Sequence, residues 1–331
     1  MTLPTRFHAS IKYVLPLTPR RLQLTRVLIV FLDGIGIGDD AAATNPLAAA
    51  VTPALDALLD GRRLVAPALP YTGAKASARG LDAVLGVDGL PQSGTGQAAL
   101  LTGVNAARMF GRHFGPYGPT ALRPMIASDN ILARAGLAGR MVAFANAYPA
   151  QLLAMATVAR PPLPLRASIV VAALGAGVLN RHEPELIGGD AIASEITTEG
   201  WRERLGLTTM PDVSAAQAGR NLAAIANGHD LTLFAHYSTD SAGHLRDMEA
   251  GVAAWQRVDA FIGGLVPALC DDVLLAIVSD HGNLEDVRAQ HTRNPALCIL
   301  AGPGHATLAA RLDSLTDIAP ALLGALGVAL K

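Results

Sequence analysis

The sequence predicts an α/β fold with a doubly wound, mostly parallel sheet and helices on both of its faces. Short apolar runs rich in β-branched residues, typical of buried parallel strands, recur along the chain. Segments with helix signals alternate with these runs, as in doubly wound folds. Hydrophobic residues make up 51% of the 331 residues and charged residues only 16%, so the chain can bury a large core.

The first half of the chain begins this alternation. In order, we expect a strand at 27–32, a helix at 53–59, a glycine-rich turn at 93–97 feeding a short helix at 98–103, a helix at 126–138 and a strand at 140–146. Thr52 stands where an N-cap is expected, and Pro53 follows at the first helical position. Gly139 ends the expected helix at 126–138.

The second half resumes the alternation after an irregular stretch. We expect a helix at 214–226, a strand at 231–237, a loop holding Asp240 and His244, a helix at 249–265, strands at 273–278 and 296–300, and a closing helix at 317–330. The stretch 147–210 has several prolines and no clean alternation. The sequence therefore predicts an N-terminal extension (1–25), a core (26–146 and 211–331) and a small inserted cap (147–210).

Charge and composition argue against two classes of partner. Lys and Arg number 26 and Asp and Glu 27, so no basic field exists to hold a nucleic acid or an anionic membrane. The longest uncharged stretch, 141–159, contains Asn146, Pro149 and Gln151, which would be costly inside a membrane. We expect neither a nucleic-acid nor a membrane partner, and the sequence indicates no oligomeric state.

The N-terminus and the cysteines bear on location. The first 25 residues contain no sustained apolar region with a cleavage site, so we expect no signal peptide. Cys270 and Cys298 both lie in apolar contexts, which favours buried, reduced thiols over a disulfide. We therefore expect a cytoplasmic protein.

Three expected strands are each followed by aspartate or histidine side chains that can bind a metal ion. Asp33 follows strand 27–32, Asp240 and His244 follow strand 231–237, and Asp280 and His281 follow strand 273–278. His291 and the Ser93 turn lie elsewhere in the chain. Parallel strands present their carboxyl ends at one edge of the sheet, so we expect all these side chains to converge there.

The converging side chains suit divalent cations. Three aspartates and three histidines give mixed oxygen and nitrogen ligands, which favour Mn²⁺ or Zn²⁺ over Ca²⁺. With a serine oxygen they are about enough for two ions. Two divalent ions and three carboxylates leave a positive centre, which suits a phosphate ester. A metal-bound Ser93 hydroxyl would be acidified into a usable nucleophile.

Five motifs together resemble the alkaline phosphatase superfamily. They are LDGIGIG at 32–38, SGTGQ with LLTG at 93–103, TDSAGH at 239–244, SDHGN at 279–283 and HT at 291–292. More narrowly, they resemble its metalloenzyme branch, which holds cofactor-independent phosphoglycerate mutase and phosphopentomutase. The motifs are in the family's order and span roughly residues 26–300. The resemblance implies an alkaline-phosphatase-like core.

The resemblance also implies roles for single residues. Asp33, Ser93, Asp280 and His281 match one metal site, and Asp240, His244 and His291 match the other. Ser93 matches the residue that becomes phosphorylated. Two features depart from the family: Gln97 stands where a histidine is common, and the cap at 147–210 is small. The cap of the mutases supplies arginines that grip the substrate, so Arg108, Arg112 and His113 are candidates here.

These observations predict a binuclear, metal-dependent phosphoryl-transfer enzyme that works through a phosphoserine. We expect a phosphomutase-like activity on a small phosphorylated metabolite, with two Mn²⁺ or Zn²⁺ ions as cofactors. A phosphatase or phosphodiesterase of the same superfamily is the alternative, because a short, open cap favours hydrolysis. A non-catalytic relative that acts as a binding module is a further alternative, although such proteins usually lose ligands that this chain keeps.

Overall fold

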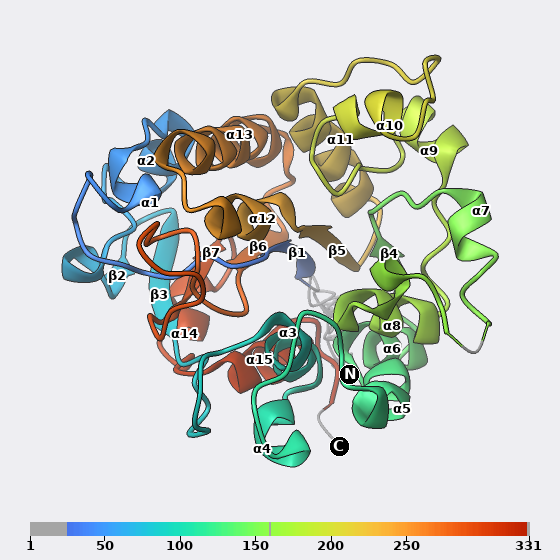
Figure 1. Cartoon of the computed structure of the whole chain (residues 1–331), viewed down its shortest axis with the longest axis horizontal. Helices are drawn as coiled ribbons and strands as arrows, with labels where there is room; N and C mark the ends of the chain where they lie inside the picture. Colours follow the sequence, from blue (N-terminus) through green and yellow to red (C-terminus); the bar gives the residue numbers. More distant parts are fainter. Residues whose placement is uncertain (1–24, 159, 330–331) are drawn as a thin grey trace, which may run out of the picture.

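The computed structural model describes residues 25–158 and 160–329, so the predicted extension at 1–25 lies outside it except for residue 25. The described residues form a seven-stranded sheet in the order β2-β3-β7-β6-β1-β5-β4 (Figure 1). The strands, in sheet order, are Tyr71–Thr72, Ala76–Leu81, Ala296–Ala301, Val273–Val278, Arg26–Leu32, Leu231–His236 and Val142–Phe144. The block β6-β1-β5-β4 is parallel, and β7, β3 and β2 each join antiparallel.

Helices cover both faces of this sheet, as the sequence predicts. Alternate residues of β1 point to opposite faces, so Val27, Ile29 and Phe31 join one core cluster and Leu28, Val30 and Leu32 join the other. The helices of the first cluster are α3 (Ser93–Thr102), α4 (Ala106–Phe110), α5 (Arg123–Ser128), α6 (Ile131–Leu137), α8 (Ser168–Gly175), α14 (His305–Ala309) and α15 (Ile318–Ala325).

The second cluster lies on the opposite face of the sheet (Figure 1). Its helices are α1 (Pro46–Ala49), α2 (Pro53–Leu58), α11 (Ala215–Asn227), α12 (Ser238–Leu245) and α13 (Met248–Leu265). Trp255, Val258 and Phe261 of α13 are almost fully buried there. The expected doubly wound architecture is confirmed, with every strand of the parallel block buried on both sides.

Two predicted helices differ from the structure. The segment 126–138 is not one helix, because the chain breaks at Asn130 into α5 and α6. The Asn130 side chain accepts from the backbone N–H of Leu132 (2.9 Å) and donates to the carbonyl oxygen of Ile126 (2.8 Å), so it caps a new helix. The closing helix α15 is shorter than predicted. It ends at Ala325, and Gly327 follows with a positive φ of 68°.

The stretch 147–210 contains four short α-helices among its described residues: α7 (Ala150–Leu153), α8, α9 (Glu183–Gly188) and α10 (Glu199–Glu203). Ile169 and Val170 of α8 pack into the first core cluster. By contrast, Leu186, Trp201 and Met210 belong to a small cluster of their own. The division into core and cap remains a prediction, and the stretch contributes to both kinds of packing.

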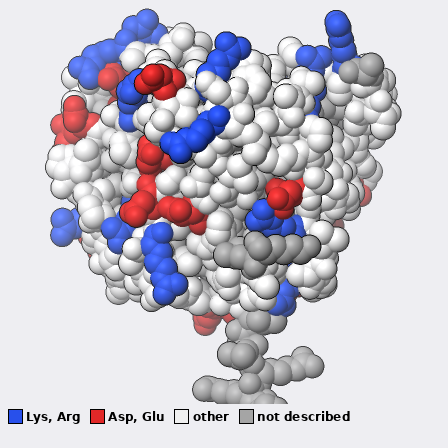
Figure 2. Space-filling view, turned by 90° about the horizontal axis from the view of Figure 1, so that it is seen from below, with Lys and Arg blue, Asp and Glu red and all other residues white. Residues whose placement is uncertain are grey.

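Surface features complete the picture. On the face that Figure 2 shows, Lys and Arg side chains stand in small groups between acidic and uncharged residues. No helix of the described residues is long and apolar enough to cross a membrane.

Cys298 is buried as expected, but Cys270 is exposed because it precedes β6 in a surface turn, so the prediction of two buried thiols is wrong for Cys270.

Candidate metal centre and nucleophile

The three strands that precede the candidate ligands, β6, β1 and β5, are neighbours in the parallel block. Leu32, the last residue of β1, pairs with His236 of β5, and Phe31 pairs with Val278 of β6. The backbone N–H of Asp33 donates to the carbonyl oxygen of His236 (2.9 Å). The residues that follow these strands therefore leave the sheet side by side at one edge.

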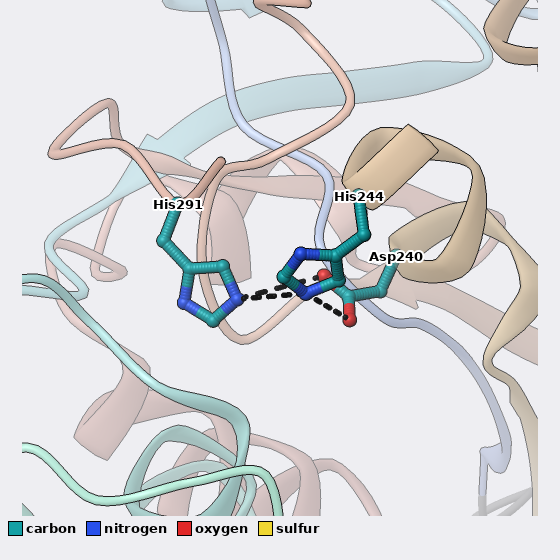
Figure 3. A group of neighbouring side chains, drawn as sticks. All are labelled: Asp240, His244 and His291. Carbon is teal, nitrogen blue, oxygen red and sulfur yellow. Dashed lines mark hydrogen bonds and ion pairs between the residues drawn. The ribbon is translucent and has the colours of Figure 1, made fainter. Parts of the chain in front are cut away.

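The first group of candidate ligands is Asp240, His244 and His291 (Figure 3). Asp240 and His244 lie four residues apart on helix α12, so they share one helix face; the predicted loop here is wrong. Nε2 of His244 lies 3.2 Å from Oδ2 of Asp240. Nε2 of His291 lies 3.3 Å from Nε2 of His244 and 3.8 Å from Oδ1 of Asp240.

A hydrogen bond at Nδ1 fixes the orientation of the His291 ring. Its Nδ1 lies 2.7 Å from the carbonyl oxygen of Pro91, so Nδ1 carries the proton and Nε2 offers a lone pair to the group. Burial, with the nearby charge of His281, lowers the pKa of His291 to about 4. The ring is therefore neutral at physiological pH, which is the form that binds a metal ion.

The second group surrounds Nε2 of His281. The Ser93 hydroxyl lies 2.9 Å from this nitrogen, Oδ1 of Asp33 lies 3.3 Å away and Oδ1 of Asp280 lies 3.8 Å away. All four side chains are almost fully buried. The His281 ring also stacks on His291 with centroids 4.1 Å apart, which places the two groups next to each other.

Ser93 is the first residue of helix α3, so the predicted turn at 93–97 is wrong. The glycines serve close packing instead of a loose turn. A Cβ on Gly94 would meet the carbonyl oxygen of Tyr117 at 2.1 Å, and one on Gly96 would meet that of Asp280 at 2.8 Å. The Ser93 hydroxyl therefore lies at the positive end of a buried ten-residue helix, which favours an anionic group there.

The electrostatics of the site call for cations. Burial, followed by the charge of Asp33, raises the pKa of Asp280 well above 3.8, and burial with Asp240 also raises the pKa of Asp33. Burial lowers the pKa of His281, but Asp280 and Asp33 outweigh it and raise this pKa to about 10. Oδ1 of Asp33 and Oδ2 of Asp280 are buried without a hydrogen bond. Such a donor set fits divalent cations, which would satisfy these oxygens.

Several supporting residues were not singled out by the sequence analysis. Asn283 donates to Oδ1 of Asp240 (2.6 Å), and the Thr239 hydroxyl donates to the carbonyl oxygen of Asp33 (2.6 Å). Nε2 of Gln97, noted before only as a departure from the family, donates to Oδ2 of Asp33 (3.3 Å). These contacts hold candidate ligands in place, and the position of Asn283 two residues after His281 was the available signal.

Glu285 is a buried support that the sequence analysis missed. Its Oε2 accepts from the backbone N–H groups of Gly36 (2.9 Å) and Asn283 (2.8 Å). Its Oε1 accepts from the hydroxyl of Thr292 and from Nδ2 of Asn294 (3.0 Å). One carboxylate thus ties together the segments that follow β1, β6 and His291.

A cleft of about 300 Å³ opens beside Ser93, Asp33 and Asp240. Its other lining residues are Gln97, Pro116, Tyr117, Tyr148, Pro164, Ala167, Ser194, Tyr237 and Ser241. Four of them come from the predicted cap at 147–210. Burial, followed by the charges of Tyr148 and Asp33, raises the pKa of Tyr237 well above 10, so its hydroxyl stays protonated.

The structure does not bring the three substrate-binding candidates into this cleft. Arg112 and His113 line a separate hollow with Gln92, and Arg112 lies over the ring of Phe114. Nε2 of His113 lies within hydrogen-bond distance of the carbonyl oxygens of Val84 (3.1 Å) and Val87 (3.3 Å). Arg108 is exposed on α4. Their role in gripping a phosphate remains a prediction.

Part of the chain is similar to curated proteins. One is the 2,3-bisphosphoglycerate-independent phosphoglycerate mutase of Cereibacter sphaeroides, 34% identical over 128 residues, which cover 36% of this chain and 25% of that protein. Another is 2,3-bisphosphoglycerate-independent phosphoglycerate mutase 2 of Methanosarcina acetivorans, 36% identical over 30% of this chain and 21% of that protein. The chain thus matches about a quarter of the length of these relatives.

Solved structures match over nearly the whole chain. The PH0037 protein of Pyrococcus horikoshii aligns with a TM-score of 0.56 and 13% identity, covering 93% of this chain and 98% of that one. The alkaline phosphatase of Thermus thermophilus aligns with a TM-score of 0.50 and 15% identity, covering 93% and 92%. At this identity the likeness concerns the fold alone.

The family model of the Metalloenzyme superfamily matches residues 25–330. That range contains both groups of candidate ligands and the cleft. The match confirms the family that the five motifs predict, and with it the expectation of a metal-dependent enzyme. The chain belongs to the Metalloenzyme superfamily, a branch of the alkaline phosphatase superfamily.

Proposed function

We propose that this protein is a binuclear, metal-dependent phosphoryl-transfer enzyme with Ser93 as its nucleophile. One observation carries the proposal. A buried serine hydroxyl at a helix N-terminus lies 2.9 Å from Nε2 of His281, within a cluster of aspartates and histidines that faces a cleft. A hydroxyl with such neighbours can act as a nucleophile, whereas an ordinary buried serine satisfies a backbone group.

The two groups of side chains divide the cations between them. Asp240, His244 and His291 would hold one, and Asp33, Ser93, Asp280 and His281 would hold the other. Asp240 also lies within reach of Asp33 and His281, so its carboxylate links the two groups. Two Mn²⁺ or Zn²⁺ ions, when bound, would stabilise charge on the attacking and leaving oxygens.

The residues of the chain supply orientation and the covalent step. Gln97 holds Asp33, Asn283 holds Asp240, and Pro91 fixes the tautomer of His291. The Ser93 hydroxyl gives up its proton as its oxygen attacks phosphorus in line, and the P–O bond to the alcohol part breaks. The departing oxygen takes the electron pair of that bond and a proton from solvent, so that it leaves as the alcohol. The N-terminus of α3 favours the phosphoserine that results.

The acceptor of the phosphoryl group defines two versions of the function. A phosphomutase acting on a small phosphorylated metabolite returns the group to a second hydroxyl, and the names of the curated relatives favour this version. A phosphatase or phosphodiesterase passes the group to water. The second version is favoured by the cleft, whose described lining offers no Lys or Arg to retain an anionic intermediate. We take the mutase as the first candidate.

Replacing the nucleophile tests the proposal. We expect Ser93→Ala to lower kcat roughly 10⁴-fold while metal content stays close to that of the unsubstituted protein. Ser128→Ala is the matched control, because that exposed hydroxyl bonds only to the carbonyl oxygen of Pro124. Turnover by Ser93→Ala at the rate of the unsubstituted protein would refute the assignment of Ser93 as the nucleophile. Free phosphate as the sole product from a sugar phosphate would end the mutase version.

A further inference from the structure

The hollow that Arg112 lines lies directly beside the cleft. The chain passes from one to the other at two places. Gln92 lines the hollow and the next residue, Ser93, lines the cleft; Gly115 lines the hollow and the next residue, Pro116, lines the cleft. These two segments therefore form a wall that the hollow and the cleft share. The hollow has a volume of about 450 Å³, against about 300 Å³ for the cleft.

The two segments of this wall are in close contact. A Cβ on Gly115 would lie 2.9 Å from Oε1 of Gln92 and 3.4 Å from the backbone nitrogen of Ser93. The backbone N–H of Thr95 donates to the carbonyl oxygen of Phe114 (3.0 Å), and the Phe114 N–H donates to the Thr95 hydroxyl (3.1 Å). The loop that lines the hollow is thus fixed to the first turn of α3, which carries the candidate nucleophile.

Three guanidinium groups gather at the hollow. Arg112 lines it, and Nη2 of Arg108 lies 3.0 Å from where a Cβ on Gly86 would stand, in the segment that leads into it. Burial lowers the pKa of His113, and the charge of Arg293 lowers it further, so Arg293 lies near this lining residue. None of the three arginines forms an ion pair with a carboxylate among residues 25–158 and 160–329.

Arg112 is oriented by two aromatic rings. Its guanidinium carbon lies 5.7 Å from the centre of the Phe110 ring and 5.9 Å from that of Phe114. Asp88 is the one acidic residue in the described lining of the hollow, and the three arginines outweigh its charge. A planar guanidinium binds phosphate or carboxylate groups through two parallel hydrogen bonds. The hollow is therefore suited to an anionic group.

We propose that the substrate carries a second anionic group, which binds to Arg112 in the hollow while the reacting phosphoryl group lies at Ser93. This inference rests on the proposed function, since it places the reaction in the cleft. The two cations of the cleft would be engaged by the reacting phosphoryl group, and the described lining of the cleft has no Lys or Arg for another anion. The arginines on the other side of the wall supply that charge.

The wall determines how far apart the two anionic groups must be. Pro116 is exposed, so the wall ends at the surface and a ligand can pass over it. A short acid such as 3-phosphoglycerate has only two carbons between its ester oxygen and its carboxylate. We expect it to be too short to reach over two backbone segments. A phosphorylated sugar with a second phosphate at its other end has the sugar unit as a spacer.

Two esters that differ by one phosphate test the inference. With Mn²⁺-loaded enzyme, we compare kcat/KM for fructose 1,6-bisphosphate and fructose 6-phosphate, with p-nitrophenyl phosphate as a simple ester. We expect the bisphosphate to exceed the monophosphate at least about fivefold, mainly through a lower KM. Because Arg112 is exposed, this advantage should shrink in about 0.5 M KCl.

The possible failures of this comparison are distinguishable. Equal values for the two fructose esters, or turnover of p-nitrophenyl phosphate alone, would overturn the inference and leave the proposed function intact. An absence of turnover on all three esters, with Mn²⁺ and with Zn²⁺, would overturn the proposed function and this inference together.

A substitution assigns the preference to the hollow. Arg112→Met removes the charge and keeps an apolar chain against the rings of Phe110 and Phe114. We expect it to bring the ratio of the two kcat/KM values, bisphosphate to monophosphate, close to one. Arg220→Met is the matched control, because this exposed arginine lies on α11 at the opposite face of the sheet and bonds to Gln217. A ratio that Arg112→Met leaves unchanged would place the second anion elsewhere and overturn the assignment.

Two further variants separate recognition from a role in the fold. Arg112→Glu should bring the same ratio below one, whereas Arg112→Lys should keep part of the preference, because a point charge still attracts the phosphate. Tm and metal content should not change in either variant, since the side chain is exposed. Equal ratios in the lysine, methionine and glutamate variants, together with a lower Tm, would mean that Arg112 supports the loop and would overturn the inference.

Discussion

Asn283 donates from its side-chain amide both to Oδ1 of Asp240, at 2.6 Å, and to the Asp240 carbonyl oxygen, at 3.1 Å. The amide therefore fixes the carboxylate that belongs to the first group of candidate ligands and lies within reach of Asp33 and His281 of the second. Supports of this kind are worth roughly 10- to 100-fold in metal affinity. We expect Asn283→Ala to weaken Mn²⁺ binding by that factor in a calorimetric titration. Asn221→Ala, on α11, where the side chain accepts from Nε2 of Gln217 and not from a candidate ligand, should bind as the unsubstituted protein does.

Gly34 is required for contact as well as for conformation. Its φ is 68°, and a Cβ there would lie 2.5 Å from Oδ1 of Asp240. Gly61 has a similar φ of 75° but nothing within 4 Å, so it is a matched control. We expect Gly34→Ala and Gly61→Ala each to lose about 1–2 kcal/mol of stability in urea, from the left-handed conformation alone. Only Gly34→Ala should also lose metal, and equal metal content in both variants would contradict the contact argument.

Asp280 should destabilise the metal-free protein. Burial, with the charge of Asp33, raises its pKa well above 3.8, so the carboxyl opposes folding increasingly as the pH rises above that value. We expect Asp280→Asn to reduce the fall in Tm of the metal-free protein as the pH rises from 5 to 8, because the asparagine cannot ionise. The same variant should lose the rise in Tm that added Mn²⁺ causes. Asp271→Asn, at an exposed position, should change neither value.

Metal binding should release a proton from His281. Asp280 and Asp33 raise the pKa of this imidazole to about 10 in spite of its burial, so the metal-free protein carries the proton at neutral pH. Its contribution to metal-free stability is complete below pH 6.5 and is lost as the pH rises through about 10. We expect release of about one proton per protein at pH 7.5, measured by calorimetry in buffers of different ionisation enthalpy. An affinity that stays constant between pH 6 and 8.5 would contradict this prediction.

Glu285 should matter chiefly to stability. Its two oxygens accept from four donors that belong to three separate segments. Glu285→Gln replaces an acceptor oxygen by a donor and leaves buried N–H groups unpaired, which should cost about 2 kcal/mol in urea unfolding. Glu203→Gln, at an exposed position, is the control and should cost less than half that amount. A cost as small for Glu285→Gln would mean that the three segments hold together without it.

The parallel block and the convergence of its strand ends could be predicted from the sequence. The apolar runs at 27–32, 231–237 and 273–278 give buried strands, and the position of Asp33, Asp240 and Asp280 after them gives the shared edge. Such runs are long enough and uniform enough that few other structures compete. The local conformation of Ser93 could not be predicted in the same way, because glycines that look like a turn serve close packing within α3.

The residues that hold the candidate ligands in place could not be predicted from the sequence, and the reason is physical. Glu285 and Gln97 act on segments far from them in the chain, and a lone acid or amide carries no local signal of a distant partner. The break at Asn130 was also missed, because the apolar periodicity continues through it while the side chain caps a new helix. Tyr237 was expected as the last residue of a strand, but β5 ends at His236, and only the structure shows that Tyr237 lines the cleft beside Ser93.

The order of the ligand-bearing segments along the chain has a consequence for biosynthesis. Asp33, Ser93 and Asp240 leave the ribosome well before His281 and His291, and Gly34 contacts Asp280 across 246 positions. A nascent or truncated polypeptide that ends before His281 cannot complete either donor set, and one that ends before His291 still lacks a member of the first. Cation uptake is therefore a late event, and a metal-loaded molecule is one whose central strands have already paired.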